Sequence, residues 1–234
     1  MTTIAKWLMP VLGVALLLFL VGCEDPVPVG PLSPAVLPTA ARLTSLSFVD
    51  PSHGWVVAEN CPGVDGSESG DCRALVYATT NGGESWSPAG RMLLVPRRVQ
   101  FTDSTTGWLV GGIGKQCGSS TCPNVVMQTT DAGRTWQRTS TTSVDLIDLS
   151  FASPRDGWIL GQTCSTSTNC TATLDSTDST GQTWSNQRLP LAGHGFRLDR
   201  LNPSLGWVGG ITNGQAVLIS TSDGAKHWAR LDTP

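Results

Sequence analysis

Residues 129–136 read TTDAGRTW, and three related segments end at other tryptophans: TTNGGESW (79–86), STDSTGQTW (176–184) and TSDGAKHW (221–228). Their tryptophans follow one another at intervals of about 50 residues. A second series interleaves with the first, because Gly-Trp dipeptides end at Trp55, Trp108, Trp158 and Trp207 with the same interval. Two interleaved series with one period indicate four internal repeats.

Each repeat carries the pattern of about four short strands. The segment VQFTDSTTGWLV (99–110) reads as a strand, a polar turn and a second strand, and 46–57, 149–160 and 199–210 read alike. Apolar runs such as NVVMQ (124–128) precede the other tryptophans. This predicts an all-β fold, a small β-propeller of four-stranded blades over 43–96, 97–144, 145–192 and 193–234. The ring is either closed by these blades, or open and completed by a second copy or a partner.

The segments of the first series resemble the Asp-box, or BNR, repeat, in which an Asp caps the turn, a Gly takes positive φ and a Trp packs into the blade. The third segment then carries one extra residue. The fourth has Ala225 at the Gly position and His227 at the Thr position, so we expect a distorted turn. The residues to which we assign this structural role are Asn81, Gly83, Trp86, Asp131, Gly133, Trp136, Asp178, Gly181, Trp184, Asp223 and Trp228.

The N-terminus has the pattern of a lipoprotein signal. Residues 1–22 contain Lys6 and then an apolar run that is shorter than the roughly 20 residues of a membrane span. The run ends in Leu-Val-Gly-Cys, which resembles the bacterial lipobox, and the resemblance implies lipidation of Cys23 after cleavage. Residues 23–42 are rich in proline and predict a semi-extended tether. The predicted location is extracytoplasmic, with the lipid anchored in a bacterial membrane.

The six remaining cysteines fall between the Gly-Trp strand and the next strand of the first three repeats. We predict three local disulfides in an oxidising compartment. Zinc is the alternative, but the three His of the chain, His53, His194 and His227, are too scattered to complete such sites. The predicted pairs are Cys61 with Cys72, Cys117 with Cys122, and Cys164 with Cys170.

Composition and motifs argue against several functions. Charged residues are 14% of the chain and the net charge is −3, so we expect no nucleic-acid partner. A sialidase would need a Tyr nucleophile, and Tyr77, the one Tyr, lies in a strand leading outward. Asp145 and Asp148 could form a pair of catalytic carboxylates, but solvated charges at a strand start are the simpler interpretation. We therefore predict a protein that is not an enzyme and has no metal or cofactor.

A set of arginines is the one candidate binding surface. Counted back from Phe101 and Leu201, Arg97 and Arg197 hold the same position in the second and fourth repeats. With Arg98 and Arg200 they could form a basic rim that binds carboxylates. The alternative is local pairing with nearby aspartates.

Together, the lipobox, the Gly-Trp strands and the Asp-box segments make residues 43–234 similar to the propeller family of photosystem II assembly and stability factors. That resemblance implies a membrane-anchored, non-enzymatic scaffold that binds a membrane protein through a basic patch, for which the four arginines are the counterparts. The family's members have more blades than the four counted here. A carbohydrate-binding or degenerate glycosidase propeller is the alternative function.

Overall fold

The structure is a computed structural model that describes residues 41–61, 72–113, 123–142 and 144–231. The predicted all-β class is confirmed, since every regular element in these ranges is a β strand and neighbouring strands pair antiparallel. The same ranges contain no helix with the length and apolarity to span a membrane. The predicted signal peptide, most of the tether and Cys23 lie outside the described residues.

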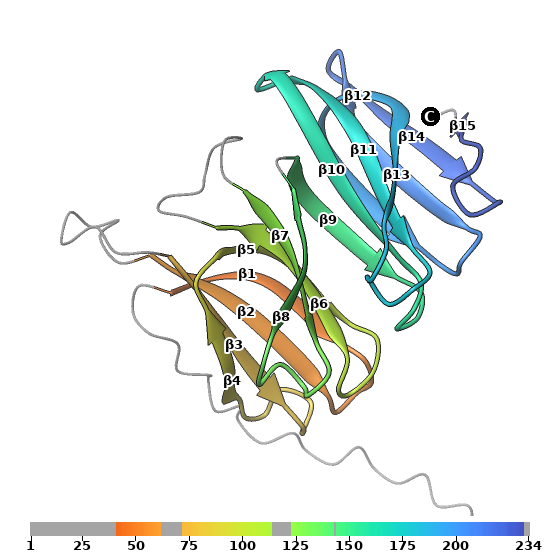
Figure 1. Ribbon diagram of the computed structural model, residues 1–234. Helices are drawn as coiled ribbons and strands as arrows, with labels where there is room; N and C mark the ends of the chain where they lie inside the picture. The colour runs from red at the N-terminus through yellow and green to blue at the C-terminus, as the bar shows by residue number, and fades with distance from the viewer. Residues whose placement is uncertain (1–40, 62–71, 114–122, 143, 232–234) are drawn as a thin grey trace, which may run out of the picture. The chain divides into compact units, whose positions relative to one another are not determined.

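The strands form three sheets, in each of which the strands follow chain order (Figure 1). The first sheet consists of β1 (Ala41–Phe48), β2 (Gly54–Asn60), β3 (Arg73–Thr79) and β4 (Ser87–Met92). The second consists of β5 (Val95–Phe101), β6 (Gly107–Gly112), β7 (Asn124–Thr129) and β8 (Gln137–Thr142). The third has seven strands: β9 (Asp145–Phe151), β10 (Gly157–Thr166), β11 (Asn169–Thr177), β12 (Ser185–Arg200), β13 (Gly206–Thr212), β14 (Gln215–Thr221) and β15 (Ala229–Leu231).

The predicted count of four blades is not confirmed, because β12 belongs to two repeats at once. Residues of β12 up to Gly193 pair with β11, and residues from His194 onward pair with β13. At Gly193 the strand takes φ 141°, and a Cβ there would collide with the carbonyl oxygen of Ile211. Only glycine fits this bend, so the third and fourth predicted blades are joined into one sheet.

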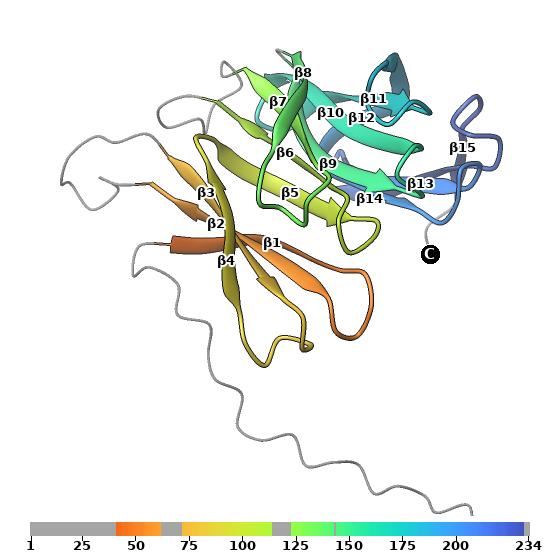
Figure 2. The ribbon, with the colours of Figure 1, turned by 60° about the horizontal axis from the view of Figure 1, so that its bottom comes forward.

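The first strands of successive repeats lie side by side, as Figures 1 and 2 show for β1, β5 and β9. Side chains of each strand bind the backbone of the next. Ser47 Oγ accepts a hydrogen bond from Phe101 N at 2.9 Å, and Gln100 Oε1 accepts one from Phe151 N at 2.7 Å. Asp148 Oδ2 likewise accepts from Leu198 N of β12 at 3.0 Å. The structure shows no closed ring, because large apolar side chains on β1 remain exposed.

Four turns, which we call the box turns (79–86, 129–136, 177–184 and 221–228), share one hydrogen-bond pattern. In the second turn, Asp131 Oδ1 accepts from Thr135 N at 2.9 Å, and Gly133 N donates to Thr129 Oγ1 at 3.0 Å. Asn81 and Asp223 accept from Ser85 N and His227 N in the first and fourth turns, both at 3.0 Å. The fourth turn keeps the pattern with Ala225 at φ 71°, so the expected distortion is not found.

The third box turn corrects the predicted alignment. Thr183 N donates to Ser179 Oγ at 3.0 Å, and Gly181 N donates to Thr177 Oγ1 at 3.1 Å. Ser179 therefore occupies the place that Asp131 has in the second turn, and the turn carries no extra residue. The structural role assigned to Asp178 is wrong, because its neighbour performs it.

Two of the predicted disulfides are present, Cys61–Cys72 and Cys164–Cys170. Each closes the hairpin between the second and third strands of its repeat, and they indicate an extracytoplasmic, oxidising location. The pair Cys117 and Cys122 lies outside the described residues. Glu59 lies close to the first disulfide, but sulfurs bonded to each other are not thiolate ligands for a metal.

The backbone of the third box turn is strained at Thr180, which has φ 60°. A left-handed conformation costs a β-branched residue roughly 1–2 kcal/mol. Gly82 and Gly224, at the equivalent position of two other box turns, adopt it without this strain. We expect Thr180→Gly to raise the free energy of unfolding in urea by about 1 kcal/mol. The matched control is Thr130→Gly, at an exposed position with no positive φ, which should lower stability. A loss of stability in Thr180→Gly would contradict the assigned strain.

Asp131 makes the fold sensitive to acid. Hydrogen bonds from Thr135 lower the pKa of its carboxyl from 3.8 to about 2. The ionised carboxyl therefore stabilises the fold fully at pH values above its pKa in the unfolded chain. This stabilisation is lost as the pH falls through its lower pKa in the folded protein. Asp131→Asn, which copies Asn81, should flatten the decrease of melting temperature between about pH 4 and pH 2. A melting curve series with an unchanged slope would refute this.

Candidate ligand-binding site

Stacked aromatic rings join the successive repeats. Trp55 of β2 stacks on Phe101 of β5 with ring centroids 3.7 Å apart, and Trp108 of β6 stacks on Phe151 of β9 at 4.0 Å. A tryptophan from the next box turn stands edge-on to each Phe, Trp136 at 6.0 Å and Trp184 at 6.4 Å. Each junction is thus a buried aromatic cluster.

The third junction replaces the phenyl ring with a guanidinium. Arg200 pairs with Gly206 in the register in which Phe101 pairs with Gly107, so the two residues are structurally equivalent. Its guanidinium carbon lies 4.1 Å from the ring centroid of Trp158, a cation–π contact. The alignment of the repeats in the sequence, which made Leu201 the equivalent of Phe101, is therefore wrong by one residue.

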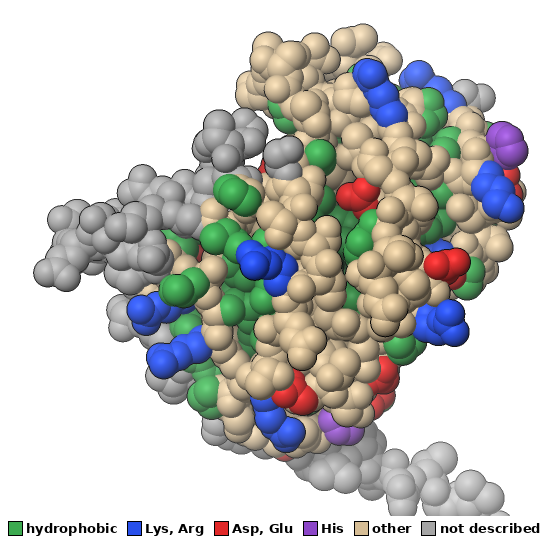
Figure 3. All heavy atoms as spheres, in the orientation of Figure 1, with side chains coloured by type: hydrophobic (Ala, Val, Ile, Leu, Met, Phe, Trp, Pro, Cys, Tyr) green, Lys and Arg blue, Asp and Glu red, His purple; other side chains and the backbone are tan. Residues whose placement is uncertain are grey.

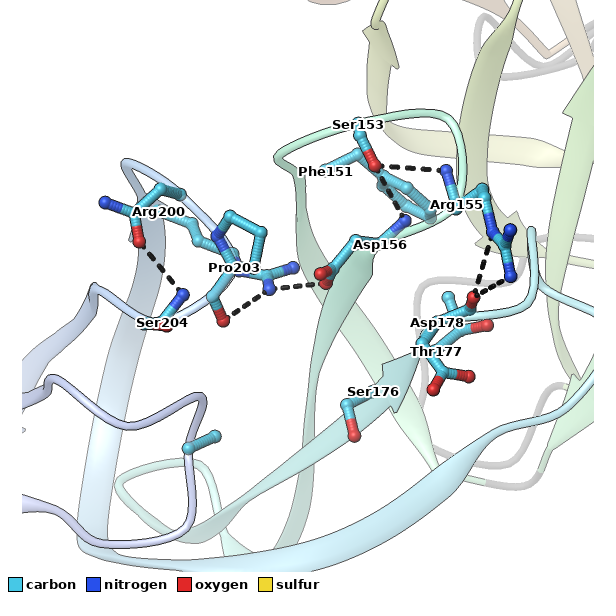
Figure 4. A network of polar contacts seen from close by, with 12 residues as sticks. Phe151, Ser153, Arg155, Asp156, Ser176, Thr177, Asp178, Arg200, Pro203 and Ser204 are labelled. Carbon is cyan, nitrogen blue, oxygen red and sulfur yellow. Dashed lines mark hydrogen bonds and ion pairs between the residues drawn. The ribbon is translucent and has the colours of Figure 1, made fainter.

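Arg200 is buried with part of its hydrogen-bonding capacity unused. Its side chain is 1% exposed. Nη2 donates to the Asp156 carboxylate and, at 2.9 Å, to Pro203 O, as Figure 4 shows. Its Nε and Nη1 have no partner among the described residues, and neither has Nε1 of Trp228. Burial lowers the pKa of the guanidinium, and the ion pair with Asp156 opposes that effect.

A pocket of about 240 Å³ opens beside this junction. Its lining combines two carboxylates, a guanidinium, four hydroxyls and one indole. The turn after β9 supplies Asp156, and the third box turn supplies Asp178. The lining residues are Asp156, Trp158, Ser176, Thr177, Asp178, Thr183, Ser185, Arg200, Pro203 and Gly224.

The pocket collects the places where the chain departs from its own repeat. Arg200 stands where the other junctions have Phe, and Asp156 stands where His53 and Thr106 precede the Gly-Trp dipeptide. Because Ser179 completes the box turn, the Asp178 carboxylate is left without a hydrogen bond among the described residues, while its backbone oxygen accepts from Arg155 at 3.4 Å (Figure 4). Such departures from a regular pattern concentrate at functional sites.

The arginines of the predicted rim have different surroundings. Arg97 pairs with Asp145 at 2.7 Å, and Arg98 pairs with Asp148 at 3.2 Å. Arg197 Nη1 donates to Phe196 O at 2.8 Å, and Arg200 is buried. On the face drawn in Figure 3 the Lys and Arg side chains lie mostly singly.

Asp145 and Asp148, the carboxylate pair considered for catalysis, are held in structural contacts. Asp145 accepts from Gln162 Nε2 at 3.0 Å in addition to its ion pair. Asp148 takes the place of Ser45, since each accepts a hydrogen bond from the backbone of the next first strand. Their roles are explained by the joining of β5, β9 and β12.

The sequence comparison missed the pocket, although a signal for it was present. Counting seven residues back from each Gly-Trp tryptophan gives Phe48, Phe101, Phe151 and Arg200. One basic residue in a series of phenylalanines marks the junction that differs. The pairing of Arg200 with Asp156 had no such signal, because it depends on the turn geometry after β9.

Comparison with known proteins supports the fold. No protein-family model matches the chain, and no curated protein does. A family 117 glycoside hydrolase of Zobellia galactanivorans is 10% identical, with 82% of this chain and 69% of that chain covered and a TM-score of 0.52. An α-L-arabinofuranosidase of Fusarium graminearum is 11% identical, with 83% and 68% covered and a TM-score of 0.52. An acylaminoacyl peptidase of Pyrococcus horikoshii is 8% identical, with 83% and 32% covered and a TM-score of 0.54.

These similarities show a propeller-like fold, while the resemblance to Asp-box proteins and photosystem II factors gains no further support from them. They also overturn the prediction that the protein is not an enzyme. All three similar structures are enzymes, two of them acting on carbohydrates. The lack of a recognised catalytic motif was therefore not a sufficient reason to exclude catalysis, which has to be judged from the site.

A double variant tests whether Arg200 is retained at the expense of stability. Arg200→Phe with Asp156→Thr copies the junction at Phe151, where Thr106 precedes the Gly-Trp dipeptide. Replacing a buried ion pair by well-packed apolar groups often raises stability by roughly 1–4 kcal/mol. We expect a higher unfolding midpoint in urea for the double variant, and a lower one for Arg200→Ala, which leaves Asp156 unpaired. A double variant less stable than the parent would show that Arg200 is a structural residue.

Proposed function

We propose that the protein is a carbohydrate-active protein of the extracytoplasmic side, and that it binds a neutral sugar unit in the pocket at Arg200 and Asp156. The observation that carries the proposal is the replacement of an aromatic junction by a polar pocket, in a fold shared with carbohydrate-degrading enzymes. No comparable observation favours the membrane-protein scaffold. The predicted lipid on Cys23 would hold the domain at a membrane.

The lining has the groups that a sugar requires. Sugar hydroxyls both donate and accept, and the pocket offers carboxylates that accept and hydroxyls that do either, above the buried guanidinium of Arg200. The volume of about 240 Å³ lies below the roughly 300–1,000 Å³ of sites for larger ligands, which suits a single ring.

The charges favour a neutral sugar over an acidic one. Asp156 is paired with the one cation among the lining residues, Arg200. Asp178 adds a negative charge that no lining residue balances, and the Arg155 guanidinium beside it already donates to the Asp178 backbone oxygen, so a uronate should bind more weakly than a neutral sugar. Glycosidases use two carboxylates for acid, base or nucleophilic roles, and Asp156 and Asp178 are the candidates for those roles.

The test measures binding and hydrolysis with defined probes. Saturation-transfer NMR with L-arabinose and D-galactose should detect contact with the full chain, with D-galacturonate as the acidic comparison. The 4-nitrophenyl glycosides of the two neutral sugars report hydrolysis.

Two pocket variants should each weaken sugar binding at least tenfold: Asp178→Asn, and the double variant Arg200→Phe with Asp156→Thr. Glu84→Gln, an exposed acidic residue of the first box turn, is the matched control and should bind as the parent does. The proposal would be contradicted if both pocket variants bind a neutral sugar as the parent does, or if the parent binds neither neutral sugar.

A further inference from the structure

The first sheet presents an apolar face to solvent. Leu43, Leu46 and Phe48 of β1 are 58%, 63% and 43% exposed. We call these three residues the β1 face. They belong to the first strand of the first repeat, and no strand of the described residues covers them.

The equivalent positions are buried in every other repeat. Leu46 pairs with the residue after the Gly-Trp tryptophan, as Val99, Leu149 and Leu198 do. Those three residues are at most 7% exposed. Phe48 corresponds to Phe101, Phe151 and Arg200, which are at most 8% exposed. The β1 face therefore has the apolar side chains that are buried in the interfaces between the other repeats, but here they are exposed.

The structure shows what covers such a face. At each junction the partner is the Gly-Trp strand of the preceding repeat, whose tryptophan stacks on the Phe or Arg. Trp55, Trp108 and Trp158 are at most 2% exposed as a result.

The last repeat carries the opposite half of this interface. Trp207 is only partly buried, and so is Leu218, whose counterparts Val76, Val126 and Leu174 are at most 3% exposed. We call Trp207 and Leu218 the Trp207 face. Within residues 41–231, no further repeat covers it.

We propose that the β1 face of one copy binds the Trp207 face of a second copy, head to tail. The contact continues an interface that the chain already forms at three junctions. Phe48 would receive Trp207 as Phe101 receives Trp55. Repeat proteins normally end in polar caps, and the described residues include no such cap on either face. Two complementary faces on one chain produce a heterologous contact, which closes a ring or extends a series.

Sedimentation velocity of the full chain in mild detergent tests the contact. The parent should form assemblies of two or more copies. Leu46→Glu on the β1 face and Trp207→Glu on the Trp207 face should each give monomers, and Leu218→Glu is a second variant of the latter face. Leu93→Glu is the matched control, because Leu93 is 59% exposed and lies between β4 and β5. Thermal melting identifies any variant that fails to fold.

Mixing the variants separates the proposal from its alternatives. Leu46→Glu retains an intact Trp207 face, and Trp207→Glu retains an intact β1 face, so the mixture should form one-to-one pairs. A mixture that stays monomeric would point to a symmetric contact between like faces and overturn the proposal. A parent that is monomeric at every concentration would also overturn it, leaving closure within one chain or cover by residues 1–40.

Discussion

The fold depends on one contact, the stacking of a Gly-Trp tryptophan on the residue that begins the next repeat's turn. Trp55 on Phe101 and Trp108 on Phe151 are the plain examples, with interplanar angles of 7° and 15°. The contact is local to each junction, so repeats can be added in series. Its two exceptions explain the remaining features of the molecule. Where the Phe is an Arg, a pocket opens. On β1, where no described strand lies against the equivalent side chains, an apolar face is exposed.

Burying Arg200 where the other junctions have Phe has a free-energy cost for folding. A buried cation loses its hydration, and its one ion pair compensates only in part, because two of its nitrogens, Nε and Nη1, have no partner among the described residues. Two neighbouring departures from the repeat also contribute polar groups to this pocket. Asp156 supplies the counter-charge of Arg200, and Asp178 is not needed in the box turn because Ser179 makes its hydrogen bond there. Under the proposed function, these three changes all serve one ligand-binding pocket.

Periodicity revealed the all-β class, the strand pattern and two of the disulfides, because each follows from local spacing. The continuity of β12 was missed, since the bend at Gly193 depends on contact with β13. The role of Ser179 was missed because the Asp of the motif lies one position earlier, where a letter-by-letter match selects it. The pocket was missed because the arginines were compared by distance from Leu201. The apolar faces depend on which repeat packs against which, and that information is absent from a single strand's pattern.

The function rests on Arg200 being part of a binding site. Its Nε–H group gives a resolvable signal in proton–nitrogen NMR spectra, and Arg200→Phe with Asp156→Thr assigns that signal by removing it. Titration of the full chain with L-arabinose should shift the Arg200 Nε signal in step with binding, because a sugar in the pocket would change the surroundings of the guanidinium that lines it. A sugar that binds while the Arg200 signal stays fixed would contradict the assignment of the pocket.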